Sequence, residues 1–119
     1  MIERVLWALL ALLHVVPAFA LLRPSLISQL YGVDAGGPVF ALLHHRAALF
    51  LVVFVVALWA AIDPAVRKLA SIAVSISVVS FLVIYWQAGA PVSLRTIAIA
   101  DLVGLPILAC ATWLAWRAR

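Results

Sequence analysis

The chain has 119 residues, of which 69% are hydrophobic and 10% are charged, and its formal net charge is +4. A soluble domain is roughly half apolar and about a quarter charged, so this composition excludes an ordinary soluble fold and indicates an integral membrane protein. The few Lys and Arg residues are scattered at segment ends rather than gathered in a basic stripe, which argues against nucleic-acid binding.

Four apolar segments follow one another along the chain. Each has roughly the 17–25 residues needed to cross a hydrocarbon core about 30 Å thick. They cover approximately residues 5–22, 38–62, 66–86 and 92–116, and turns containing Pro or Gly separate them. We therefore expect a single transmembrane domain, residues 1–119, that folds as an all-α integral membrane four-helix bundle.

The connection between the first two segments, residues 23–37, is the longest. Residues 25–31 mix apolar and polar side chains at near-helical spacing, and Gly32 follows them. This pattern fits a short interfacial helix and also a plain loop, and in either form the connection could cover polar residues below it.

The first segment has a second interpretation. Ala18-Phe19-Ala20 follows Pro17 and resembles the cleavage pattern of a secretory signal, which would leave three spans. Glu3 lowers the positive charge ahead of the segment, and His14 interrupts its apolar core. Both residues favour an uncleaved first span.

Four spans place both termini on one side of the membrane. The basic residues assigned to that side outnumber those on the other side, and they are Arg4, Arg67, Lys68, Arg117 and Arg119. Because cytoplasmic loops carry an excess of Lys and Arg, we expect cytoplasmic termini, with the 23–37 connection exterior.

Ionisable residues inside these segments are the strongest functional signal, since charges at membrane depth are costly and tend to face a bundle interior or a wet cavity. At about 1.5 Å per residue, His44, His45 and Arg46 lie roughly 9–12 Å below the exterior surface, His14 about 12 Å and Asp101 roughly 14 Å. Arg95 lies closer to that surface. These residues predict a polar ligand site in the outer half of the membrane.

Helical geometry limits which of these residues converge. Consecutive residues point about 100° apart, so at least one of His44, His45 and Arg46 faces sideways. We expect one histidine to face inward and Arg46 to reach toward Asp101 or outward to the surface. An Arg46–Asp101 pair that only fixes helix packing is equally open, and Gly104 on the face of Asp101 allows a neighbour to approach closely.

Two short segments resemble those of a poorly characterised family of small bacterial four-span membrane proteins. They are the His44 to Phe50 stretch, similar to HRA-x-LF, and the Leu94 to Gly104 stretch, similar to LRR-x-x-IAD-x-x-G, with Thr96 in place of the second Arg. The resemblance implies the same fold, the same polar residues and a location in a bacterial inner (cell) membrane. Some members carry the label phosphopantetheine adenylyltransferase, which does not suit this chain because it has no phosphate-cradling loop or soluble α/β region.

Three classes of function remain open. The polar residues could bind or help to transport a small molecule or ion, or they could fix an accessory subunit in a homo-oligomer or larger membrane complex. Alternatively, His14 with His44 or His45 could supply the axial ligands of haem b in an electron-transfer module. An enzyme in which a histidine acts as base and Asp101 orients it is also open, but no nucleophile or metal constellation of recognisable spacing supports it. The single Cys110 cannot form an internal disulfide.

Overall fold

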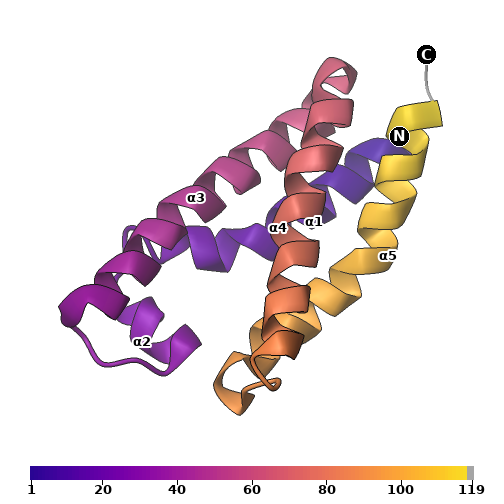
Figure 1. Cartoon of the computed structure of the whole chain (residues 1–119). Coiled ribbons are helices and arrows are strands. Elements are labelled where there is room, and N and C mark those ends of the chain that lie inside the picture. Colours follow the sequence, from indigo (N-terminus) through magenta and orange to yellow (C-terminus); the bar gives the residue numbers. More distant parts are fainter. Residues whose placement is uncertain (118–119) are drawn as a thin grey trace.

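The structure, a computed structural model, describes residues 1–117 as helices joined by short turns (Figure 1). The elements in chain order are α1 (Ile2–Phe19), α2 (Ser25–Tyr31), α3 (Gly37–Ile62), the 3-10 turn η1 (Pro64–Val66), α4 (Arg67–Gln87), the 3-10 turn η2 (Val92–Leu94) and α5 (Arg95–Arg117). No strand occurs among the described residues, so the predicted all-α class is confirmed.

Four of these helical segments are long and apolar enough to cross a membrane. They are Ile2–Phe19, Gly37–Ile62, Pro64–Gln87 and Val92–Arg117. Their outward faces carry large apolar side chains that are half or more exposed, among them Leu42, Leu69, Val83 and Trp86. Such faces suit a lipid bilayer, where apolar side chains outside the bundle contact acyl chains.

The first helix is displaced from the predicted span. It runs from Ile2 to Phe19 instead of covering residues 5–22. Beyond it the chain tightens into a turn, in which the amides of Leu21 and Leu22 donate to the carbonyls of Ala18 and Phe19 at 3.1 and 3.0 Å. The apolar character of this turn explains why hydropathy alone extends the span too far.

The 23–37 connection contains the short helix α2, one of the two forms that the sequence allowed. The helix ends at Gly32, whose φ of 67° lies in the left-handed region that glycine adopts readily. The Gly32 amide donates to the Ser28 carbonyl at 3.0 Å. The chain can then turn back toward the start of α3.

The helices form two apolar clusters at opposite ends of the molecule. The larger cluster joins α1, α3, α4 and α5 near the start of α1, and it includes Trp7, Leu10, Ala60, Val74 and Leu108. The smaller cluster, Ala20, Ile27, Tyr31 and Ala47, packs α2 against α3 and the end of α1, and we call this the α2 end of the molecule. α3 and α4 meet at η1 and diverge toward the α2 end (Figure 1).

Candidate functional site

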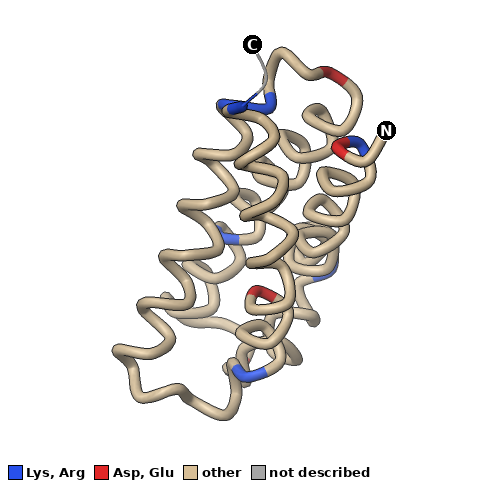
Figure 2. The backbone as a smooth tube through the Cα atoms, turned by 90° about the vertical axis from the view of Figure 1, so that its right-hand side faces the viewer, with Lys and Arg blue, Asp and Glu red and all other residues tan. Residues whose placement is uncertain are grey.

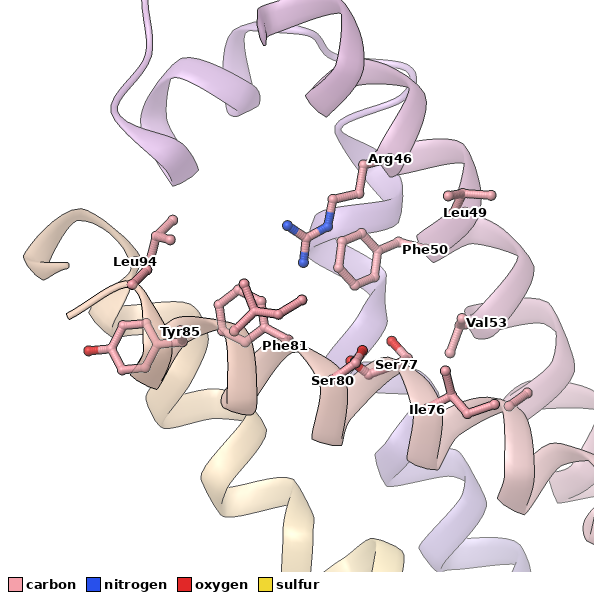
Figure 3. Close-up of a pocket in the computed structure, with 13 residues that line it drawn as sticks. Arg46, Leu49, Phe50, Val53, Ile76, Ser77, Ser80, Phe81, Tyr85 and Leu94 are labelled. Carbon is pink, nitrogen blue, oxygen red and sulfur yellow. The ribbon is translucent and has the colours of Figure 1, made fainter. Parts of the chain in front are cut away.

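The divergence of α3 and α4 creates a cavity of about 520 Å³ between them (Figure 3). Most of its lining is apolar, and the polar groups are one guanidinium and three hydroxyls. The lining residues are Arg46, Leu49, Phe50 and Val53 of α3, Ala73, Ile76, Ser77, Ser80, Phe81, Ile84 and Tyr85 of α4, Ala88 just after α4, and Leu94 of η2.

Arg46 extends from α3 into this cavity (Figure 3). Aromatic rings from three helices lie around its guanidinium: Cζ is 4.9 Å from the ring centroid of Phe50, 5.3 Å from that of Phe81 and 5.7 Å from that of Tyr31. Phe50 follows Arg46 by one helical turn and therefore shares its face of α3. These distances allow cation–π attraction at every ring.

The rings do not satisfy the N–H donors of the guanidinium. Arg46 forms no hydrogen bond or ion pair with any residue of the described chain. A guanidinium carries five N–H donors in a planar fork. The donors of Arg46 are therefore free to bind an acceptor in the cavity.

The predicted pairing of Arg46 with Asp101 is absent as a direct contact. Within residues 1–117, the one ion pair joins Glu3 and Arg67 at 3.2 Å. α3 packs against α1 and α4, and α5 packs against the same two helices, so α3 and α5 do not present adjoining faces for such a pair. Asp101 is half-buried and does not line the cavity.

The Tyr31 phenol lies within electrostatic range of both Arg46 and Asp101. Burial in the α2 cluster is the main factor that raises the pKa of the Tyr31 phenol, the positive charge of Arg46 opposes that rise, and the charge of Asp101 adds to it. The phenol therefore lies in a region where the fields of Arg46 and Asp101 overlap, although the two side chains do not touch.

His44 and His45 have different environments, as their 100° offset requires. The Nε2–H of His44 donates to the Leu21 carbonyl at 3.0 Å, and its ring lies 6.3 Å from that of Phe40. His45 is exposed on the outer face of α3. His44 thus provides a partner for a carbonyl that the end of α1 leaves free, which is a structural task.

His14 is buried in α1, only 2% exposed. Its Nδ1–H donates to the Leu10 carbonyl, one turn earlier in the same helix, at 2.9 Å. The ring centroid of His14 is 6.0 Å from that of Phe50, which lines the cavity. His14 therefore lies behind the cavity wall and supports it from α1.

These positions do not fit bis-histidine haem b. Axial ligation needs two imidazoles that face each other across a shared space and offer free ring nitrogens. The Nε2 of His44 is engaged by a backbone carbonyl, His45 points outward and His14 is enclosed in the bundle. Residues 1–117 also contain no group of three His, Cys, Asp or Glu side chains that could hold a metal ion.

Arg95 is exposed at the first position of α5 and does not line the cavity. Of the predicted site residues, Arg46 alone lines it and His14 adjoins it, while His44, His45, Arg95 and Asp101 lie elsewhere. The aromatic rings around Arg46 were not anticipated from the sequence. The one-turn spacing of Arg46 and Phe50 was available in the sequence, whereas the approach of Tyr31 and Phe81 depends on helix packing.

Neither a protein-family model nor a curated protein nor a solved structure matches this chain.

Proposed function

We propose that the protein is a bilayer-embedded binding protein that holds a small anionic molecule in the α3–α4 cavity, with Arg46 as the anion-binding residue. The observation that carries this proposal is the guanidinium of Arg46, which faces the cavity among three aromatic rings without an acceptor for its N–H groups.

The cost of such an arrangement supports a ligand. An Arg at membrane depth is expensive unless it pairs, reaches water or contacts a polar group. Cation–π contacts contribute about 0.5–2 kcal/mol each, and they leave the N–H groups without acceptors. A carboxylate or phosphate oxygen pair would accept two parallel N–H bonds from the fork, which are stronger than bonds between neutral groups.

The remaining lining fits the body of an organic molecule. Known small-molecule sites are mostly apolar cavities of about 300–1,000 Å³ with a few polar groups that fix orientation. Here the cavity of about 520 Å³ adds only the hydroxyls of Ser77, Ser80 and Tyr85 to the guanidinium. The ligand that suits this lining has one anionic group and a larger apolar part.

The proposal includes residence in a bacterial cell membrane, with the start of α1 on the cytoplasmic side. One group of charged positions lies at the end of the bundle where both termini lie, and the other charged positions are spread along the rest of the bundle (Figure 2). More basic residues belong to the end where α1 begins, among them Arg4, Arg67, Lys68 and Arg117, and the positive-inside bias assigns that end to the cytoplasm. A reporter that is active only in the cytoplasm should be active when it is fused after α5, and a reporter that is active only outside the cytoplasm should be inactive there.

The binding proposal can be tested with protein reconstituted in lipid nanodiscs. The probes are two anions with uncharged analogues, 2-naphthoate with 2-naphthamide and hexadecanoate with hexadecanamide. A ligand that binds the folded state raises the unfolding temperature. At least one anion should stabilise the wild type, its amide should not, and Arg46→Gln should need at least tenfold more anion for the same shift.

Two further variants control for folding and for nonspecific charge. Arg95→Gln removes an exposed Arg from the same half of the molecule and should bind like the wild type. Arg46→Lys keeps the charge without the fork and should give intermediate binding. If Arg46→Gln and the wild type respond equally to both anions, or if the wild type responds to each amide as strongly as to its anion, the proposal is wrong.

A further inference from the structure

The cavity opens on the side of the bundle. Leu49 of α3 and Ile76 and Ile84 of α4 line it, yet they are 55%, 64% and 62% exposed on the outer faces of their helices. In a bilayer these side chains meet acyl chains rather than water. A molecule dissolved in the membrane can therefore reach the cavity between α3 and α4.

The approach from the α2 end is covered. α2 packs across the start of α3 and against η2, where Ile27 is fully buried and Tyr31 is 8% exposed. Leu94 of η2 joins the same apolar cluster and also lines the cavity. The Tyr31 ring lies 5.7 Å from the Arg46 guanidinium carbon and closes that side of the cation.

The cavity is elongated and its polarity changes along its length. Its lining on and just after α4 extends from Ala73 to Ala88, or about 22 Å at about 1.5 Å per residue. The cation and Tyr85 lie toward the α2 end, and Val53 and Ala73 line the deeper, apolar part. Phe81, whose ring centroid lies 5.3 Å from the Arg46 guanidinium carbon, is eight residues or about 12 Å along α4 from Ala73. This length is close to the depth of one leaflet of a hydrocarbon core, about 15 Å, so the chain of a membrane lipid has a suitable length for this part of the cavity.

We infer that the ligand is a fatty acid or a similar carboxylate with one acyl chain, which reaches the cavity from the bilayer between α3 and α4. This inference rests on the proposed function. The carboxylate binds the guanidinium of Arg46 and the chain extends along α4 toward Ala73. A carboxylate matches the charge of the lining, since Arg46 is its only basic residue, whereas a phosphate monoester carries a charge of about −1.5 to −2 at neutral pH.

The test compares chain length and cavity length in the same nanodiscs. The probes are octanoate, dodecanoate and hexadecanoate, each expressed as a mole fraction of the bilayer, with 2-naphthoate and a two-chain phosphatidate for comparison. In the wild type, apparent affinity should rise at least tenfold from octanoate to hexadecanoate, and phosphatidate should compete weakly. Ala73→Leu fills the deep part and should weaken hexadecanoate binding about tenfold while octanoate binding stays the same.

Ala109→Leu is the matched control, because Ala109 is exposed on α5 and does not line the cavity. It should bind every probe like the wild type. A hexadecanoate carrying a diazirine on its chain should label α3 and α4 in the wild type and lose that labelling in Arg46→Gln. Preserved labelling in Arg46→Gln, or equal hexadecanoate binding by Ala73→Leu and the wild type, would contradict the inference.

The outcomes separate this inference from the proposed function. Arg46-dependent binding of 2-naphthoate, with no preference for longer acyl chains, would support the anion site and overturn the fatty-acid assignment. Stronger binding of phosphatidate than of hexadecanoate would also overturn it. The absence of any Arg46-dependent binding would overturn both.

Discussion

Glu3 near the start of α1 and Arg67 at the start of α4 form an ion pair, with 3.2 Å between Oε2 and Nη1. The Nε–H of the same Arg67 donates to the Ala60 carbonyl near the end of α3 at 2.8 Å. One buried side chain thus connects three helices at the end opposite α2. This connection is independent of the cavity, so its loss should reduce stability without a specific effect on binding.

Replacement of Arg67 should therefore destabilise the bundle more than replacement of Glu3. Glu3→Gln weakens one contact of a guanidinium that keeps its bond to Ala60, and we expect a loss of about 1 kcal/mol. Arg67→Met also leaves the Ala60 carbonyl without its donor, and we expect about 2–3 kcal/mol. The free energy of unfolding can be measured by titration with a denaturing detergent.

The double variant Glu3→Gln/Arg67→Met checks the coupling. If the ion pair contributes, the double variant should lose no more than Arg67→Met alone, within about 0.5 kcal/mol. Strictly additive losses would show that the two side chains act independently.

His44 and His45 offer a test in which neighbouring residues give opposite results. His44→Leu removes the donor to the Leu21 carbonyl and should cost about 1 kcal/mol or more. His45→Leu places an apolar side chain on an exposed apolar face and should change stability by less than about 0.5 kcal/mol. Thermal unfolding of the two variants in the same detergent measures the difference, and equal losses would contradict the assigned roles.

Tyr31 should make the stability depend on pH at the alkaline end. Because burial raises its pKa above the ordinary value of 10.0, the folded protein retains the phenol proton where the unfolded chain releases it. Stability from this group is therefore complete below pH 10 and declines as pH rises from there through the folded-state pKa.

The variant Tyr31→Phe removes this titration and should show a shallower decline of unfolding free energy above pH 10. Ultraviolet absorbance of tyrosinate in the wild type and the variant provides a direct readout. An identical alkaline profile for the two proteins would mean that Tyr31 does not contribute to it.

Gly104 lies where α5 meets α1. A Cβ atom at this position would stand 2.5 Å from Cδ1 of Leu13, closer than real contacts allow. Because that atom ends a flexible side chain, we expect Gly104→Ala to cost about 1 kcal/mol and Gly104→Leu about 3 kcal/mol. Leu13→Ala removes the clashing atom. Gly104→Ala should therefore cost less free energy of unfolding in the Leu13→Ala background than in the wild type. An equal cost in both backgrounds would place its origin elsewhere.

Several of these features follow directly from the sequence, and their physical basis is local. Apolar length predicts the four long helices, and Pro and Gly separate them. Gly32 is suited to end α2 because its positive φ costs little without a Cβ. Gly104 was expected to admit a close neighbour, and Leu13 is that neighbour. Arg46 could be predicted as a site residue because burying a charge in an apolar membrane segment costs free energy, whichever helices lie beside it.

The partners of Arg46 could not be predicted in the same way. Counting residues gives the depth of a side chain along its helix but not the direction of the neighbouring helices. Arg46 and Asp101 have similar depths, but α3 and α5 each pack against α1 and α4. Tyr31 lies near Arg46 because α2 folds back over α3, and Phe81 lies near it because of the direction in which α4 diverges from α3.

That divergence begins at small residues. Ala57 and Ala60 of α3 belong to the same cluster as Ala70 of α4, close to the turn that joins the two helices. Arg46 lies eleven residues, or about 16 Å, along α3 from Ala57. If the angle between α3 and α4 changes by a few degrees at these alanines, the distance between the two helices near Arg46 changes by about an ångström. The volume of side chains far from Arg46 thus contributes to the width of the cavity around it.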